Sequence, residues 1–452
     1  MKRIDATQGN LSRQIFKYTI PLILSTILQN FFNVADKAVL GNMAGTTAVA
    51  SIAATGTISS LIISGAVGLS TGTAIVLARF VGAKDEKNIR ATIDTSLIAA
   101  VALGLLVAVA GFFLTPVFLT ATGCPEECYK GAMLYMRITL AAAPATLLYN
   151  YSSAILRSLG DTQRPLIYVA IAGVVNVGLN IILCLVLTQK VVAVAVATVA
   201  SNVVSCLLVL RRLFRTEDAA RVKLSKMRFT FSSFARIFRF GIPTSISSLV
   251  LPLGNLQIAA TINSYGAQAI AGHSAAMSVE NFVHAVANGF GSSSMTFIGQ
   301  NIGAKKADRV RKSFWLCLVF NAVFAGSLGV LTYFSGRFWL GIVLGRSADI
   351  AIEYGMLRLF YVIMFEFLNA ISSVLIGALK AFGYPMLTSI TNIIFNLGFR
   401  VFWMTMIYPM EEQFSTVMQC YTVSWMLNLS FYTIFTIVVY RRYIKTGKCR
   451  KI

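Results

Sequence analysis

Long apolar stretches recur along the whole chain, and no other feature restricts its fold as strongly. A helix needs about 20 apolar residues to cross a bilayer, and such stretches alternate here with short polar connections. Because 56% of the residues are hydrophobic and only 12% are charged, a soluble globular protein is excluded. The sequence predicts an all-α polytopic membrane protein with twelve transmembrane helices, near residues 15–40, 47–80, 92–115, 129–157, 165–188, 191–211, 237–262, 268–299, 311–336, 350–381, 384–408 and 414–441.

The positions of the basic residues predict how the chain is oriented. A formal net charge of +22 would by itself suit a nucleic-acid partner. However, about 31 of the 39 Lys and Arg residues fall on one side of the membrane if the helices alternate in direction, as the positive-inside rule requires of cytoplasmic segments. We therefore expect a multi-pass protein of the cell (inner or plasma) membrane with both termini in the cytoplasm, and no nucleic acid among its partners.

The two halves of the chain repeat each other. At a shift of 221 residues, "GLSTGTAIVLARFVGAKDEKNIR" (68–90) matches "GFGSSSMTFIGQNIGAKKADRVR" (289–311). Near the first and seventh helices, "TIPLIL" resembles "GIPTSI". At a shift of 220, three residues of the fifth helix match three of the eleventh: Pro165, Asn176 and Gly178 over Pro385, Asn396 and Gly398. Three echoes in the same order indicate an internal duplication.

The duplication predicts the domain organisation. We expect a six-helix bundle over 1–211, a cytoplasmic basic linker over 212–236 and a second six-helix bundle over 237–452. Six crossings are an even number, so both halves enter from the same side and are related by a pseudo-twofold axis along the membrane normal. This is the parallel-repeat plan of secondary transporters, which work by alternating access around a site between the halves.

Acidic residues inside the membrane are the main functional signal. Of 17 Asp and Glu residues, four lie in predicted transmembrane helices: Asp36, Asp94, Glu280 and Glu366. An ionised carboxylate near the helix centre costs about 2.5–3.5 kcal/mol, so such a group normally faces a partner or a hydrated cavity. Asp94 falls at the predicted start of its helix, where it would complement the helix dipole, and we expect a structural role for it.

Polar residues could complete a cation site around Asp36. At 100° per residue, Gln29, Asn33 and Asp36 form a stripe on one face of the first helix. On the fifth helix, Asn176 and Asn180 lie one turn apart. These oxygens suit sodium, and a buried carboxylate can also bind a proton.

Lys37 follows Asp36 directly and raises a specific question about it. Neighbours on a helix point about 100° apart, so Lys37 is expected to leave the polar stripe and reach the outer headgroups. If Lys37 turned inward instead, its charge would weaken proton binding by Asp36.

The eighth helix holds both histidines of the chain. His273, Glu280 and His284 share one face, and Met277 lies between them as a candidate for contact with an amphiphilic substrate. His273 and His284 are about 16 Å apart along the axis, so the three side chains do not ligate one ion. We predict no metal site. Glu280 and His284 either handle protons or substrate, or line a hydrated gap without a specific duty.

The energy source and the thiols can be judged from motifs. No "GxxxxGK[ST]" phosphate loop is present, so an ion gradient rather than ATP is the expected energy source. No motif with a catalytic pair is recognisable, so an enzyme is not expected, nor is a cofactor.

Cys124 and Cys128 lie in the short outward segment "GCPEEC". Whether they form a disulfide stays undecided, because the bond would close a very small loop.

The pattern as a whole resembles a known family. Pro21 with Asp36, "ARFVGAKDEKNIR", "LRSLGDTQRPL" and "GFGSSSMTFIGQNIGAKKADRVRKS" are similar to motifs of the multidrug and toxin compound extrusion (MATE) transporters, of the MOP flippase superfamily. The resemblance covers nearly the whole chain. It implies a secondary antiporter, expected to be monomeric, that exports amphiphilic or cationic drugs or metabolites in exchange for H⁺ or Na⁺. The alternative within the superfamily is a flippase for a lipid-linked sugar or another amphiphilic lipid.

The resemblance also implies which residues bind the coupling ion. Asp36, Asn176, Asn180 and a threonine of the sixth helix, Thr198, match the family's cation site in the amino-terminal half. Some relatives carry an acid on the seventh helix, where this chain has only amides, Asn255 and Gln257.

The second half departs from the family pattern at another place as well. Other relatives have an aspartate on the tenth helix at the position of Asn369. Glu366 lies three residues earlier and could replace it in a second-half site. Alternatively, Glu366 could form an ion pair with Arg358 or Arg400.

Overall fold

The computed structural model describes residues 3–43, 45–121, 123–345, 348–447 and 449–450. The side chain of Lys37 lies outside the described part, so its expected direction stays a prediction. Within the described ranges the chain is helical and forms no strand. Most helices are joined by short turns, and a longer connection runs between Phe214 and Phe231.

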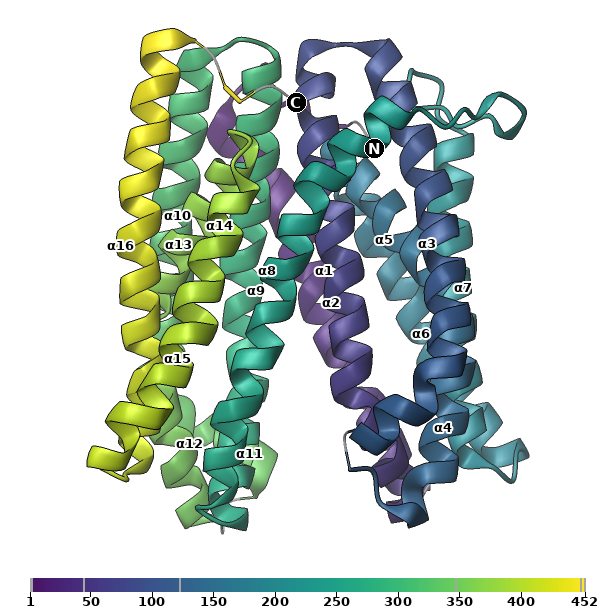
Figure 1. Ribbon diagram of the computed structural model, residues 1–452, viewed down its shortest axis with the longest axis vertical. Coiled ribbons are helices and arrows are strands. Elements are labelled where there is room, and N and C mark those ends of the chain that lie inside the picture. Colours follow the sequence, from purple (N-terminus) through teal and green to yellow (C-terminus); the bar gives the residue numbers. More distant parts are fainter. Residues whose placement is uncertain (1–2, 44, 122, 346–347, 448, 451–452) are drawn as a thin grey trace. The chain divides into compact units, whose positions relative to one another are not determined.

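The first half of the chain forms the helices α1 to α7 (Figure 1). They are α1 (Leu11–Met43), α2 (Gly45–Ala83), α3 (Glu86–Ala121), α4 (Glu126–Ala141), α5 (Ala143–Ser158), α6 (Gln163–Val186) and α7 (Lys190–Phe214). The single helix expected over 129–157 is thus two, α4 and α5, which are bent by 48°. Pro144 lies in the first turn of α5, where its missing N–H is tolerated but the preceding helix cannot continue.

The second half is less regular. Its helices are α8 (Phe231–Asn263), α9 (Ala267–Gly303), α10 (Ala307–Phe334), α11 (Gly336–Leu344), α12 (Asp349–Val362), α13 (Glu366–Ala381), α14 (Pro385–Asn392), α15 (Phe399–Phe402) and α16 (Phe414–Thr446). The expected helix over 350–381 is again a bent pair, α12 and α13, at 46°. The expected helix over 384–408 runs through α14 and α15 with two π-helical segments, Ile393–Gly398 and Trp403–Ile407.

Length and apolar composition identify the membrane spans. Nine helices of the described part pass this test, and each of the two bent pairs adds one more span. Helix α9 corresponds to the remaining predicted span and is less apolar because it carries His273, Glu280 and His284 among small residues. The helix order therefore agrees with twelve crossings.

The helices form two compact units. The first unit contains Leu24–Ser245 and a terminal segment that ends at Ile4, and the second contains Asp5–Ile23 and Ile246–Ile452. Helices α1 and α8 each belong partly to both units. These boundaries differ from those expected from chain order, because a long helix can contribute its two ends to different cores.

The segment expected as a basic linker, residues 212–236, is part of the first unit. Ala220 and Val222 are buried in one core cluster with Leu77, Ile93 and Leu213. Arg3 forms an ion pair with Asp218. Its few apolar residues are enough to pack it against α2, α3 and α7.

The internal repeat reappears as backbone geometry. Lys84 and Lys305, from the two matching Gly-Ala-Lys runs, have φ of 55° and 58° and are the only non-glycine residues with positive φ in the described part. In the first unit the next residue, Asp85, caps α3 by accepting a hydrogen bond from the backbone of Asn88 at 3.1 Å. Hydrogen bonds from Asn88 hold the pKa of Asp85 below its ordinary value.

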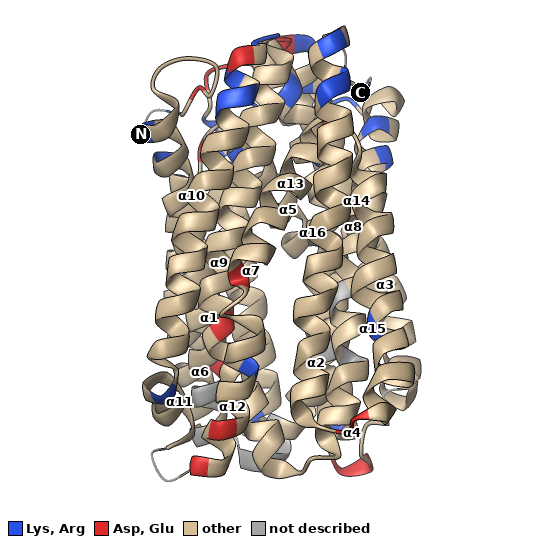
Figure 2. Cartoon of the chain, turned by 90° about the vertical axis from the view of Figure 1, so that its left-hand side faces the viewer, with Lys and Arg blue, Asp and Glu red and all other residues tan. Residues whose placement is uncertain are grey.

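The charged residues lie mostly at helix ends. Figure 2 shows Lys and Arg gathered at ends of helices, while the middle of the helices is nearly free of charge. A few buried charged side chains remain in the apolar middle, and these are the candidates for function.

Candidate functional site

Asp36 on α1 meets two amides of α6 inside the first unit. Asn180 Nδ2 donates to Asp36 Oδ1 at 2.8 Å. The amide of Asn176 lies 2.5 and 3.0 Å from the two carboxylate oxygens and donates to both when its nitrogen faces them. Asn176 and Asn180 are almost fully buried. The i, i+4 spacing along α6 is what lets both amides reach one carboxylate.

The orientation of the Asn176 amide depends on the charge of Asp36. An ionised carboxylate only accepts hydrogen bonds, so it favours the amide nitrogen. In the opposite orientation Asn176 Oδ1 faces Asp36 and also accepts from Asn180 Nδ2 at 3.2 Å, which leaves room for a proton on the carboxyl group. The cluster can therefore exist in a protonated and an unprotonated form with the same heavy-atom positions.

One oxygen of this cluster has no partner. Asn180 Oδ1 is buried and accepts no hydrogen bond in the described part of the protein. An unpaired buried carbonyl oxygen is costly unless a ligand satisfies it. With the carboxylate of Asp36 it offers the hard oxygen ligands that a sodium ion requires.

Two further residues join the cluster, and sequence reasoning missed both. Ser201 on α7 lies 3.4 Å from Asn176 Nδ2 in one amide orientation. Tyr135 on α4 interacts electrostatically with Asp36 and is hydrogen-bonded to Thr198. Thr198 is thus connected to Asp36 through the side chain of Tyr135. A tyrosine and a serine give no motif, so only the packing of α4 and α7 identifies them.

The predicted polar stripe of α1 is only partly assembled. Gln29 and Asn33 are exposed, and neither is hydrogen-bonded to Asp36 among the described side chains. The partners of Asp36 come from α6 instead of from its own helix.

A buried ion pair anchors α9 to α12 in the second unit. Arg358 Nε and Nη2 donate to the two oxygens of Glu280, both at 2.7 Å. Arg358 Nη1 donates to His273 Nδ1 at 3.2 Å, so this ring nitrogen is the acceptor and His273 is neutral. Glu280 and His284 lie on the same side of α9, but each pairs with a different residue: Glu280 with Arg358 and His284 with Glu366.

Glu366 pairs with a histidine rather than with an arginine. Its Oε1 lies 2.9 Å from His284 Nδ1 and accepts from Asn369 Nδ2 at 2.9 Å. The alternative ion pair of Glu366 with Arg358 or Arg400 is therefore wrong. Glu366 Oε2 is buried and has no partner in the described part. Glu366 and Asn369 are thus hydrogen-bonded neighbours. That Glu366 replaces the aspartate which relatives carry at the position of Asn369 stays a prediction.

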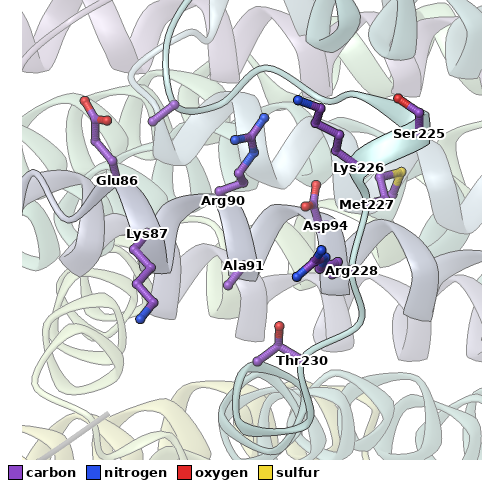
Figure 3. A pocket seen from close by; sticks show the side chains of 11 residues that line it. Glu86, Lys87, Arg90, Ala91, Asp94, Ser225, Lys226, Met227, Arg228 and Thr230 are labelled. Carbon is purple, nitrogen blue, oxygen red and sulfur yellow. The ribbon is translucent and has the colours of Figure 1, made fainter.

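Asp94 has a structural role, but not the expected one. Helix α3 begins at Glu86, so Asp94 is too far from the first turn to complement the helix dipole. Instead, it accepts a hydrogen bond from the backbone of Arg228. It lines a pocket of about 730 Å³ between α3 and the basic segment, together with Arg90 and Lys226 (Figure 3).

The remaining candidates carry less information. Met277 is half-buried on α9 and stays a prediction. Cys124 and Cys128 are free thiols. Across the described residues, no group of three His, Cys, Asp or Glu side chains is placed to hold a metal ion.

Comparison with known sequences agrees with the duplication. A family model described as MatE matches residues 21–182 and 243–404, two segments that begin 222 residues apart. Similar proteins include the probable multidrug resistance protein YpnP of Bacillus subtilis, with 26% identity over 92% of this chain and 91% of the relative. The FAD transporter of Shewanella oneidensis is 26% identical over 70% of each chain.

Solved structures share the fold. The crystal structure of MATE in complex with MaL6 has a TM-score of 0.91 at 20% identity and covers 99% of this chain and 100% of its own. An outward-facing multidrug resistance MATE family transporter of the MOP superfamily has a TM-score of 0.90 at 19% identity and covers 99% of both chains. The predicted fold of twelve helices in two six-helix halves is confirmed.

Proposed function

Because the chain belongs to the MatE family of membrane transporters, we propose that it is a secondary antiporter that exports amphiphilic or cationic drugs or metabolites in exchange for H⁺ or Na⁺. Relatives named multidrug resistance and multidrug export proteins support the efflux of small molecules. One relative is named an FAD transporter, which supports a substrate range that includes anions. The buried cluster of Asp36, Asn176 and Asn180 supports coupling to a cation, and the proposal depends on it.

Cation binding acts on the contacts between α1 and α6. A proton turns Asp36 from a pure acceptor into a donor, so the Asn176 amide presents its oxygen instead of its nitrogen. A sodium ion instead takes the carboxylate and the free oxygen of Asn180 as ligands. Either event changes how α1 packs on α6, and alternating access converts that change into release of the exported compound.

The pair of His284 and Glu366 is proposed as a second participant. A protonated His284 balances the charge of Glu366, and loss of that proton leaves the buried carboxylate without a cation beside it. Glu366→Gln and Glu280→Gln test whether the second unit contributes to coupling.

We also propose that the basic helix ends face the cytoplasm, that the host membrane is the cell membrane and that the protein acts as a monomer.

The test is transport of a fluorescent cationic dye in proteoliposomes, with a sodium gradient and a pH gradient imposed separately. Wild-type protein is expected to move the dye with one of the two gradients. Asp36→Asn keeps the size of the side chain but removes its charge, and it should abolish gradient-driven transport. Asp94→Asn is the matched control, because Asp94 accepts a backbone hydrogen bond that an amide oxygen can also accept.

The outcomes separate the alternatives. Normal transport by Asp36→Asn at wild-type expression would overturn the assignment of the coupling site. Failure of the wild-type protein with every dye and both gradients would contradict export and favour the flippase alternative.

A further inference from the structure

Arg400 on α15 is a buried cation without an acidic partner. Its side chain is 2% exposed, and a guanidinium stays charged in proteins. Its Nη1 donates to Asn255 Oδ1 at 2.9 Å, whereas Nε is buried and has no acceptor in the described structure. The two acids of the second unit that are buried among the described residues, Glu280 and Glu366, pair with Arg358 and His284 instead. The charge of Arg400 is therefore uncompensated.

The contacts that Arg400 does make are too weak to offset its burial. Its Cζ lies 4.6 Å from the ring centroid of Tyr421, and Cζ of Arg358 lies 4.8 Å from the same centroid. A cation–π contact contributes about 2 kcal/mol when desolvated, whereas burying an unpaired ion costs several kcal/mol. Two guanidinium groups on one ring also repel each other. An anion beside Arg400 would remove both penalties.

The internal repeat shows that this position is the counterpart of the cation site. Helix α8 follows α1 at a shift of 222, so Ile258 occupies the position of Asp36. Helices α14 and α15 follow α6 at a shift of 220, so Arg400 occupies the position of Asn180. Burial supports this register: the buried residues Asn176, Asn180 and Cys184 correspond to the buried residues Asn396, Arg400 and Met404.

The charge of the repeated site is thus inverted between the two units. The first unit places a carboxylate against two amides, and the second places an isoleucine and an arginine at the same positions. Ile258 is fully buried in one cluster with Met404 and Tyr421, so no acid replaces Asp36 there.

The surroundings of Arg400 suit an organic ligand and a helix that can adjust. Half-buried aromatic side chains, Tyr361, Trp403 and Trp425 among them, pack around the same cluster. The short helix α15 is flanked on both sides by π-helical segments, Ile393–Gly398 and Trp403–Ile407, whereas α6 is regular. Such π segments often mark functional positions in helices.

We infer that Arg400, with Asn255 and Tyr421, forms a subsite for the anionic group of an amphiphilic aromatic substrate, such as a carboxylate, sulfonate or phosphate. The inference rests on the proposed export function, because it names a substrate class for it. Arg400 supplies charge-assisted hydrogen bonds, and the aromatic cluster contacts the apolar body of the ligand.

The experiment compares two xanthene dyes of similar shape and opposite charge: fluorescein, used at alkaline pH as a dianion, and a cationic rhodamine methyl ester. Binding to purified full-length protein in detergent is measured by fluorescence anisotropy, without any gradient. Arg400→Gln is expected to weaken fluorescein binding by about 10- to 100-fold, the effect of losing a charged hydrogen bond, and to leave rhodamine binding unchanged. Arg400→Lys should retain most of the fluorescein affinity.

A second variant tests the inverted symmetry. Ile258→Asp restores the acid of the first unit, so it should pair with Arg400 and displace fluorescein while the protein stays monodisperse. Arg441→Gln, an exposed arginine at the end of α16, is the matched control and should change neither affinity.

Three results would overturn the inference: no binding of fluorescein by the wild-type protein, equal fluorescein affinity in wild type and Arg400→Gln, or equal loss of both dyes in a folded Arg400→Gln variant. Asp36→Asn should still bind fluorescein. If that binding persists and depends on Arg400 while gradient-driven transport is absent from the wild type, the proposed antiport fails and the anion subsite stands.

Discussion

The two units of the protein share a helix plan and differ in the charge that they bury. In the first unit, Asp36 is held by the amides of Asn176 and Asn180. In the second, Arg400 lies at the position of Asn180, and the position of Asp36 is taken by Ile258. The duplication thus keeps the order of the helices, while the side chains at matching positions differ in charge.

In the second unit buried ion pairs link the spanning helices, and no such link is found among the described residues of the first unit. Arg358 ties Glu280 to His273 across α9 and α12, and His284 ties Glu366 to the same helix α9. Along the described spans of the first unit, the half-buried Asp36 and the buried Asp94 form no ion pair. We expect proton or cation exchange at Asp36, because among the described side chains no cation is paired with this acid.

The largest effect is expected from Asn180→Arg, which gives the first unit the residue of the second. The new guanidinium would pair with Asp36 and keep it ionised, so gradient-driven dye export should fall to background. The measurement is the proteoliposome assay, with Asn180→Gln as the control that keeps an amide. Wild-type export by a folded Asn180→Arg protein would contradict the assignment of this cluster to coupling.

The next effect concerns the ion pair of the second unit. Arg358→Met leaves Glu280 charged and buried, which should destabilise the protein by about 3–5 kcal/mol. The change is measured by unfolding in detergent. The double variant Arg358→Met with Glu280→Gln should recover most of the loss, and a double variant as unstable as the single one would show that packing, not charge, dominates.

A smaller effect is expected where the helices approach closely. A Cβ on Gly254 would lie 2.4 Å from the backbone oxygen of Asn396, whereas a Cβ on Gly173 would meet only the ring of Phe32, at 1.9 Å. A ring can rotate away, whereas a backbone oxygen cannot. Gly254→Ala should therefore lower the free energy of unfolding by about 1–3 kcal/mol, and Gly173→Ala should lower it by less. The unfolding of both variants is compared in the same detergent. Equal losses of stability in the two variants would mean that the π-helical segment that contains Asn396 moves as easily as the ring of Phe32.

The smallest expected effect concerns the two matching turns at Lys84 and Lys305. Asp85 caps α3, whereas its counterpart Lys306 donates from Nζ to the carbonyl oxygen of Thr7. Asp85→Ala should therefore cost about 1 kcal/mol. The pKa of Asp85 is lowered in the folded protein, so its stabilisation is present above its ordinary value and disappears as the pH falls through the folded pKa. A difference between Asp85→Ala and wild type that persists in strong acid would exclude the carboxylate as the cause.

The sequence determined the membrane class, the positions of the spans and the duplication. These follow from local properties: an apolar run long enough to cross a bilayer needs no tertiary information to be recognised, and the duplication is legible in the matching segments that contain Gly-Ala-Lys. The interior carboxylates Asp36, Glu280 and Glu366 were also identifiable, because an acid in an apolar helix is rare.

Only the tertiary structure decided the partners of these acids. Periodicity along one helix assigned Gln29 and Asn33 to Asp36, but hydrogen bonds come from the neighbouring α6, whose register against α1 the sequence does not contain. The same holds for Glu366, which pairs with His284 and not with an arginine. The bends after α4 and α12 and the units shared by α1 and α8 are likewise set by packing between segments distant in the chain, because burial of a side chain is a property of the assembled bundle and not of its own helix.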